Sequence, residues 1–255
     1  MNQQNDSDQK KRPVATTPWS PAQTLALTAA IAITLPLVNM VVALLMSGIS
    51  AAVDPAFDQK QFYRDLRQDG HYLTYASLAA NLATIWLVLR FIDLRGAVRW
   101  PTYLAARAPA AGWIPAMIVG GAIYLLLERF VGALFDRPEF PQFLIEIYAT
   151  AEPMLLFWLA LTLVAPVAEE VLFRGFLFVG LRNSWLGSNG AILATSFLWT
   201  IIHLQYDLFD KLMIFALGIY LGWLRDRFNS ILPAVILHVV INTLALSGLV
   251  ASIER

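Results

Sequence analysis

Long runs of apolar residues constrain the fold of this chain more than any other feature of its sequence. Hydrophobic residues occupy 58% of the 255 positions and charged residues only 14%, whereas soluble domains carry about 25% charged residues. This apolar share exceeds what a single buried core requires and indicates an integral membrane protein. Because a membrane-crossing helix needs about 20 apolar residues, we expect seven of them, at about residues 23–48, 71–92, 113–134, 153–182, 189–204, 211–225 and 231–249.

The expected fold class is all-α: a polytopic membrane helix bundle of about seven transmembrane helices, with residues 21–255 in a single transmembrane domain. Residues 1–20 are polar and contain prolines, which predicts a disordered N-terminal tail. Ser50, Ala51 and Ala52 loosely resemble a signal-peptide cleavage site. The apolar run before them is longer than the usual stretch of about 7–15 residues, so we expect the first helix to be retained.

Charge and cysteine content narrow the classes of function. The net charge is zero, so no nucleic acid partner is indicated. The absence of cysteine excludes disulfides, cysteine nucleophiles and thiolate metal sites. With the N-terminus inside, the cytoplasmic loops carry ten lysine and arginine residues against seven on the other side, and Arg174 lies within a span. This weak excess predicts a cytoplasmic N-terminus, and we expect a multi-pass protein of a bacterial inner (plasma) membrane.

Three ionisable residues interrupt the fourth apolar run, in the stretch PVAEEVLFRGFLF at residues 166–178. Each ionised side chain at the centre of a membrane helix costs about 2.5–3.5 kcal/mol. On a helix Glu170 and Arg174 are four residues apart and can form an ion pair, whereas Glu169 is rotated about 100° away. We therefore expect Arg174 to hold Glu170, and Glu169 to remain free in a polar cavity. The alternative, solvation of all three at the membrane interface, fits poorly with the apolar sequence on both sides.

Polar residues also occur in two later apolar runs. His203 ends the stretch TSFLWTIIHL, and Asp207, four residues on, could orient its imidazole or could be an ordinary loop charge. His238 and Asn242, in ILPAVILHVVINTLAL, are four residues apart and share a helix face. Their alternative role is a plain hydrogen bond between helices.

Two glutamates, two histidines and an asparagine thus lie on three different apolar segments. In one intramembrane cavity, a carboxylate beside an imidazole can act as a general base towards water. A second imidazole and an amide N–H can stabilise the oxyanion of a tetrahedral intermediate. This combination is that of a hydrolase for an amide bond, and no serine, cysteine or aspartate pair in the spans offers an obvious alternative.

Taken in order, these motifs resemble the CPBP family, the CAAX protease and bacteriocin-processing (Abi) family of intramembrane proteases related to the type II CAAX prenyl endopeptidase. They read Glu169-Glu170-Val171-Leu172-Phe173-Arg174, Trp199-Thr200-Ile201-Ile202-His203 and His238-Val239-Val240-Ile241-Asn242. The resemblance covers roughly residues 150–248. The second motif of the family usually has Phe where this chain has Trp199. Because an aromatic ring is kept, we expect adjusted packing and unchanged chemistry.

The resemblance implies a role for each motif residue. Glu169 and His203 would activate the attacking water, while His238 and Asn242 would form the oxyanion site. The residues that would support the architecture are Glu170, Arg174 and Trp199.

Family members are often called metalloproteases, which raises the question of a metal. Glu169, His203 and His238 could bind Zn²⁺ with water in the fourth position. The same residues can also work without a metal. We favour the metal-free form, because no H-E-x-x-H helix is present and Asn242 suits an oxyanion role better than a ligand role.

The expected function is therefore that of an intramembrane endopeptidase, surrounded by membrane lipid, that cuts a peptide or protein tail at the membrane. A non-catalytic membrane scaffold or immunity protein of the same fold is the main alternative, and it would tolerate loss of Glu169. A transporter would be expected to show an inverted repeat, and the sequence shows none. The oligomeric state is left open.

Overall fold

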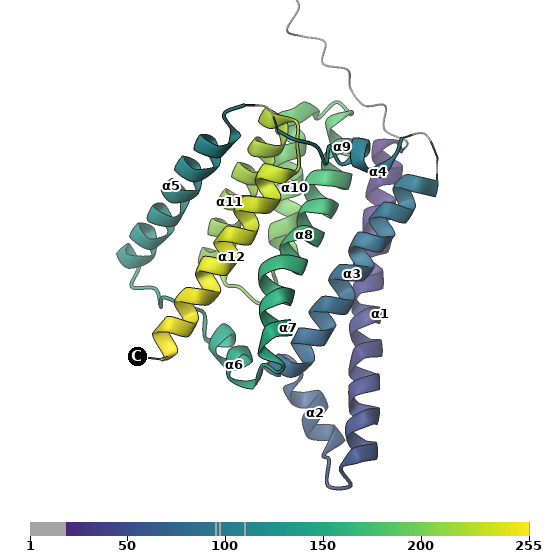
Figure 1. Ribbon diagram of the computed structural model, residues 1–255, viewed down its shortest axis with the longest axis vertical. Helices are drawn as coiled ribbons and strands as arrows, with labels where there is room; N and C mark the ends of the chain where they lie inside the picture. Colours follow the sequence, from purple (N-terminus) through teal and green to yellow (C-terminus); the bar gives the residue numbers. More distant parts are fainter. Residues whose placement is uncertain (1–18, 95, 97, 110, 255) are drawn as a thin grey trace, which may run out of the picture.

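The computed structural model describes residues 19–254 apart from positions 95, 97 and 110, and every regular element in this part of the chain is a helix (Figure 1). The expected all-α class is thus confirmed. Of the expected disordered tail, positions 1–18 lie outside the described residues. Ser20 instead caps the first helix, because its side chain accepts a hydrogen bond from the backbone N–H of Gln23 and the Gln23 side chain accepts one from the Ser20 N–H.

Two long helices packed against each other form most of the N-terminal half. Helix α1 (Pro21–Val53) runs without interruption through the suggested cleavage site, and α3 (Gly70–Leu94) packs along it after the short α2 (Gln59–Asp65). The short α4 (Trp100–Tyr103) follows, and then α5 (Trp113–Leu134), which lies at the opposite side of the bundle against α11 and α12 (Figure 1).

The C-terminal half contains the segment that carries the two adjacent glutamates. After α6 (Gln142–Thr150), residues Met154–Arg182 form a helical rod of 29 residues in which α-helix alternates with the wider π-helix. Along this central rod lie α7 (Met154–Leu159), the π-helix η2 (Ala160–Val164), α8 (Ala165–Glu170), the π-helix η3 (Val171–Leu177) and α9 (Phe178–Arg182). The remaining helices are α10 (Gly187–Ile202), α11 (Leu208–Phe228) and α12 (Leu232–Ile253).

Among the described residues, five helices are long and apolar enough to cross a membrane by length and composition: Pro21–Val53, Gly70–Leu94, Trp113–Leu134, Met154–Arg182 and Leu232–Ile253. The chain is thus an integral membrane protein. Helices also occupy the other two expected positions, but α10 has only 16 residues, and α11 carries charged residues near both ends, so neither reaches the length and apolarity of a clear span. On these criteria, five of the seven expected spans are found among the described residues.

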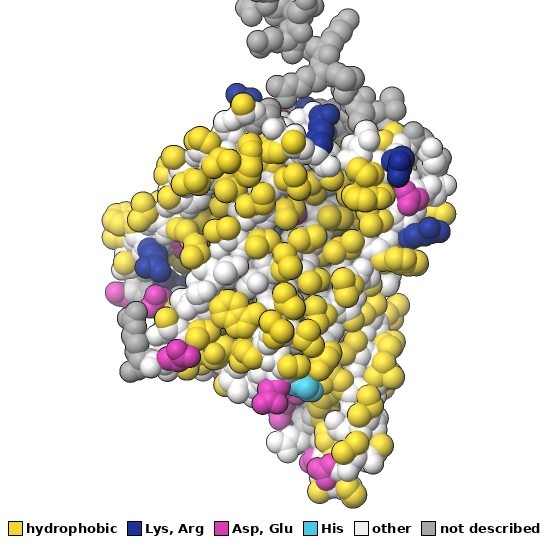
Figure 2. Space-filling model, viewed as in Figure 1, with side chains coloured by type: hydrophobic (Ala, Val, Ile, Leu, Met, Phe, Trp, Pro, Cys, Tyr) yellow, Lys and Arg dark blue, Asp and Glu magenta, His cyan; other side chains and the backbone are white. Residues whose placement is uncertain are grey.

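The surface agrees with a membrane setting. Hydrophobic side chains cover most of the face seen in Figure 2, and charged side chains lie towards its margins. In water an apolar surface of this extent would promote aggregation, whereas lipid solvates it.

The central rod is the most enclosed part of the bundle. In η3 the side chains from Leu172 to Leu177 are all buried, and this π-helix packs against α1, α3, α10 and α11. Helices α10 and α11 approach each other closely, because a Cβ added to Gly222 would lie 3.0 Å from Cγ2 of Ile192. Glu170 and Arg174, the two fully buried charged residues of the rod, therefore face protein and not lipid.

Candidate active site

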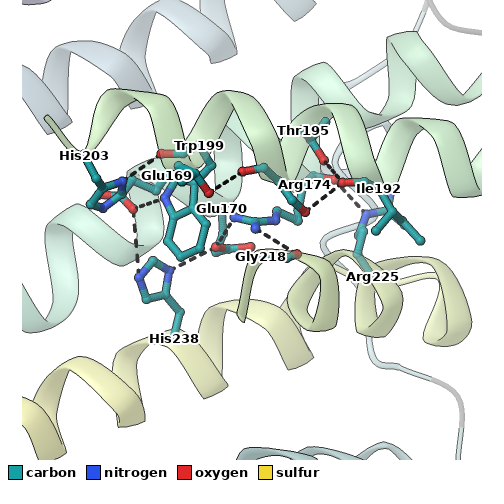
Figure 3. Close-up of polar contacts among 12 residues, drawn as sticks. Glu169, Glu170, Arg174, Ile192, Thr195, Trp199, His203, Gly218, Arg225 and His238 are labelled. Atoms are coloured by element: carbon teal, nitrogen blue, oxygen red, sulfur yellow. Dashed lines mark hydrogen bonds and ion pairs between the residues drawn. The ribbon is translucent and has the colours of Figure 1, made fainter. Parts of the chain in front are cut away.

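The motif residues come from three helical segments, the central rod, α10 and α12, and lie close together (Figure 3). A short turn at residues 183–186 joins the rod to α10, which runs back antiparallel to it. This places Trp199 beside Glu169, thirty residues earlier in the chain. Helix α12 packs against α8 and brings His238 to the same point. The convergence that the sequence motifs predicted is therefore present.

Glu170 and Arg174 form a fully buried ion pair. Both side chains are 0% exposed, and Nη1 of Arg174 lies 2.8 Å from Oε1 of Glu170. Nη2 of Arg174 donates to the backbone carbonyl of Gly218 at 3.1 Å, and the guanidinium lies over the Trp199 ring, 4.5 Å from its centroid. An ionised pair this deep is held in place by many contacts, since two buried charges need good geometry and further hydrogen bonds to offset desolvation.

Glu169 is the more exposed of the two adjacent carboxylates. Its side chain is 21% exposed, against 0% for Glu170. The indole Nε1–H of Trp199 donates to Oε2 of Glu169 at 2.5 Å, and Nε2 of His238 lies 3.9 Å from the same oxygen. Trp199 thus makes a polar contact with Glu169 in addition to packing, which corrects our expectation that this departure from the family pattern affects packing alone.

The hydrogen bonds of the two histidines assign their protons. Nδ1 of His238 lies 3.0 Å from Oε1 of Glu170, and Nδ1 of His203 lies 2.7 Å from the backbone carbonyl of Trp199. Both partners only accept, so each Nδ1 carries a hydrogen, and neither Nε2 makes a hydrogen bond to the described residues. The Trp199 ring contacts both imidazoles edge-on, with centroids 5.2 Å apart in each case.

Two sequence interpretations change in the structure. Asp207 does not orient His203: it pairs with Arg137 and accepts from the backbone N–H of Asp210, and these contacts hold the pKa of Asp207 below its usual value. Asn242 lies near the site, but its Nδ2 donates to the backbone carbonyl of Leu161 at 3.0 Å. One of its two N–H groups is therefore already engaged.

Sequence reasoning missed one residue of the site's surroundings. Arg225, in the stretch LRDRF, lies in the last turn of α11 beside other charged residues, so its sequence context gives no indication of burial. In the structure it is only 3% exposed, and its Nε donates to the backbone carbonyl of Arg174 at 3.0 Å (Figure 3). The available signal was weak, because a charge in the last turn of a helix is usually solvated.

Glu169, His203 and His238 are the residues that the sequence suggests as metal ligands. In the part of the chain that the structure describes, no group of three or more His, Asp or Glu residues could hold a metal ion. Nδ1 of each histidine is bound by a protein acceptor and Oε2 of Glu169 by Trp199, which leaves both Nε2 atoms and Oε1 of Glu169 without a hydrogen bond among the described residues. The described residues show no assembled metal site, and we assign no step to a metal.

Fold and site together define a class: a helical integral membrane protein with a buried Glu/His centre at the junction of its central rod, α10 and α12. Residues 151–244 match the family described as Type II CAAX prenyl endopeptidase Rce1-like. The resemblance that the three motifs indicated is thus confirmed over this part of the chain.

A curated relative adds similarity without a function. It is described as an "Uncharacterized 24.3 kDa protein" of Escherichia coli and is 29% identical over 145 residues, which are 54% of this chain and 60% of the relative. The chain thus spans about 60% of that relative's length. No solved structure matches the chain.

Proposed function

We propose that this protein is an intramembrane endopeptidase of the CAAX-protease type, which hydrolyses a peptide bond near the membrane with a water molecule activated by Glu169 and His203. The observation that carries the proposal is the convergence of Glu169, Trp199, His203 and His238 from three helices in one partly accessible site. Ionisable residues inside a membrane protein are costly and mark functional sites by default.

Glu169 is the proposed general base. It is the more accessible of the two glutamates, whereas Glu170 is 0% exposed and its Oε1 is bound by both Arg174 and His238. No hydrogen bond joins Glu169 to His203 in the described part of the chain. Trp199 links them instead, since its indole binds the carboxylate and its backbone carbonyl binds the imidazole. A water between Glu169 and Nε2 of His203 would have an acceptor on each side.

The oxyanion would be bound by His238 and Asn242. His238 donates its Nδ1–H to Glu170, so it can donate a second hydrogen to an oxyanion only as an imidazolium, with Nε2 also protonated. That form also balances charge, because Glu169 and Glu170 would then face Arg174 and His238. Asn242 would contribute the N–H that Leu161 does not use.

The proposed step balances as ordinary amide hydrolysis. The water oxygen attacks the scissile carbonyl carbon as its proton passes to Glu169, and the carbonyl oxygen takes the negative charge beside His238 and Asn242. The carbon–nitrogen bond then breaks as Glu169 returns the proton to the leaving amine. Preorganised donors in a site that excludes bulk water supply much of the rate enhancement.

The substrate of this proposal is a peptide or protein tail that reaches the site from the membrane surface. The weak Lys/Arg excess supports a cytoplasmic N-terminus in a bacterial inner membrane. Similarity to the prenyl endopeptidase family makes a lipid-modified tail one member of this substrate class.

The test compares cells that contain the wild-type protein with cells that contain Glu169→Gln at matched abundance, with Glu146→Gln, on the separate helix α6, as the control variant. Membrane-associated peptides are profiled by mass spectrometry. New peptide termini that depend on Glu169, and persist in Glu146→Gln, would establish proteolysis and identify the substrate. Identical profiles, with the deletion phenotype rescued by Glu169→Gln, would favour a non-catalytic scaffold.

A further inference from the structure

The two glutamates lie on a helical segment of only six residues that has a π-helix at each end. Helix α8 (Ala165–Glu170) follows η2 directly and precedes η3 directly. π-Helices are rare, and they frequently occur at functional sites. A shift of one residue in helical register rotates the side chains on one side of the shift by about 100° relative to those on the other side. The two π-helices therefore decide which way Glu169 faces relative to the segments of the rod before η2 and after η3.

Both π-helices leave a backbone carbonyl without its α-helical donor, in the same way. After η2, the N–H of Ala165 donates to the carbonyl of Ala160, five residues back, and so does not reach Leu161. After η3, the N–H of Phe178 donates to the carbonyl of Phe173 and so does not reach Arg174. A buried carbonyl without a donor is costly.

A side chain from a different helix supplies the donor in each case. Nδ2 of Asn242, on α12, donates to the carbonyl of Leu161 at 3.0 Å, and Nε of Arg225, on α11, donates to the carbonyl of Arg174 at 3.0 Å. These two bonds bracket α8. In a plain α-helix, each of these two carbonyls would accept from the backbone N–H four residues later. It would then need no side-chain donor.

Arg225 is costly as a purely structural residue. It is 3% exposed, its Nη1 has no hydrogen-bond partner among the described residues, and its neighbour Asp226 pairs with Arg182. Its guanidinium contacts the Phe178 ring at 5.5 Å. An apolar side chain would avoid the cost of burying this charge, so the Nε–H bond to the π-helix is the feature that distinguishes an arginine here.

We propose that Arg225 is a positioning residue of the active site: its Nε–H bond to the Arg174 carbonyl fixes the π-helical register of η3 and thereby the direction in which Glu169 points. Asn242 does the same at η2. The inference rests on the proposed function only where activity is measured, because the register of the rod can be tested without a substrate.

The variants follow from side-chain geometry. Arg225→Gln keeps an N–H donor at the position of Nε, the same number of bonds from the backbone, and removes the guanidinium. Arg225→Met has a side chain as long as that of glutamine and removes the donor. Arg227→Met is the matched control, because Arg227 lies two residues on and contacts only the ring of Phe228 among the interactions described.

The readout uses the absence of cysteine from the chain. One single-cysteine variant replaces Glu169, whose side chain is 21% exposed. The other replaces Ala168, which is 0% exposed. With a water-soluble maleimide in isolated membranes, we expect labelling at 169 to be about tenfold faster than at 168 in the otherwise unchanged protein, in Arg227→Met and in Arg225→Gln.

In Arg225→Met, labelling should fall at 169 and rise at 168, so that the ratio drops to about threefold or less. An unchanged ratio in Arg225→Met, or a Gln variant that behaves like the Met variant, would overturn the proposal. A rise at both positions, or loss of the Met variant from the membrane, would show general destabilisation and would also overturn it. Glu169-dependent peptide termini, scored in the same variants without added cysteine, should decrease with Met and persist with Gln. If wild type produces no such termini, the proposed function fails while the labelling result stands.

Discussion

Replacing Arg174 by alanine removes the cation from a pocket in which both partners are 0% exposed. Glu170 would keep His238 as a partner at Oε1, while its Oε2 already has none among the described residues. The Gly218 carbonyl would lose its donor, and the Trp199 ring would lose the guanidinium that lies 4.5 Å from its centroid. Breaking a buried pair in this way costs about 3–5 kcal/mol.

The assay is the free energy of unfolding in detergent, from denaturant titration. The internal control is Arg182→Ala, which breaks the pair with Asp226 at 3.1 Å, where the two side chains are 32% and 27% exposed. An exposed pair contributes about 0–1 kcal/mol. Arg174→Ala should therefore lower stability by several times the loss seen for Arg182→Ala, and it should also lower the folded yield.

A double variant separates loss of the pair from loss of packing. Glu170→Gln combined with Arg174→Met removes both charges and keeps similar volumes, so it should recover about half or more of the stability that Arg174→Ala loses. If Arg174→Ala and Arg182→Ala have equal effects, the structural role assigned to the buried pair is wrong.

Two further predictions concern the chemistry of the site. Trp199→Phe keeps a ring against both histidines and removes only the Nε1–H bond to Glu169. A hydrogen bond to a charged group contributes about 1.5–3 kcal/mol. The rate at which Glu169-dependent termini form should therefore fall about 10- to 100-fold. An unchanged rate would reduce Trp199 to a packing role. Because the described residues hold no cluster of metal ligands, an excess of chelator should leave the formation of these termini unchanged in isolated membranes. Loss of cleavage that is restored by added Zn²⁺ would contradict this geometry.

The local part of the site could be predicted because it depends on helix geometry alone. Glu170 and Arg174 are four residues apart, so any helix brings them together, and their contact at 2.8 Å is the expected ion pair. The same argument separated Glu169 from that pair. The motif spacing also indicated which residues of α10 and α12 belong with them.

The non-local contacts had no comparable signal. Nothing within a few residues of Asp207 shows that Arg137 binds it in place of His203, since Arg137 lies 70 residues earlier in the chain. Likewise, the burial of Arg225 depends on how α11 packs against η3. Sequence spacing reports which side chains share a helix face, but not which helix lies opposite that face.

By itself, the sequence determined that this chain is a bundle of membrane helices with a Glu-Glu-Arg motif inside it, because hydropathy and helical periodicity are properties of neighbouring residues. Only the tertiary structure decided the register of the central rod. In an α-helix each backbone carbonyl accepts from the N–H four residues later, and in a π-helix from the N–H five residues later. The π-helices leave the carbonyls of Leu161 and Arg174 without a backbone donor. Asn242 donates to the first and Arg225 to the second. The direction of Glu169 is therefore set by residues that are more than 50 positions away from it in the chain.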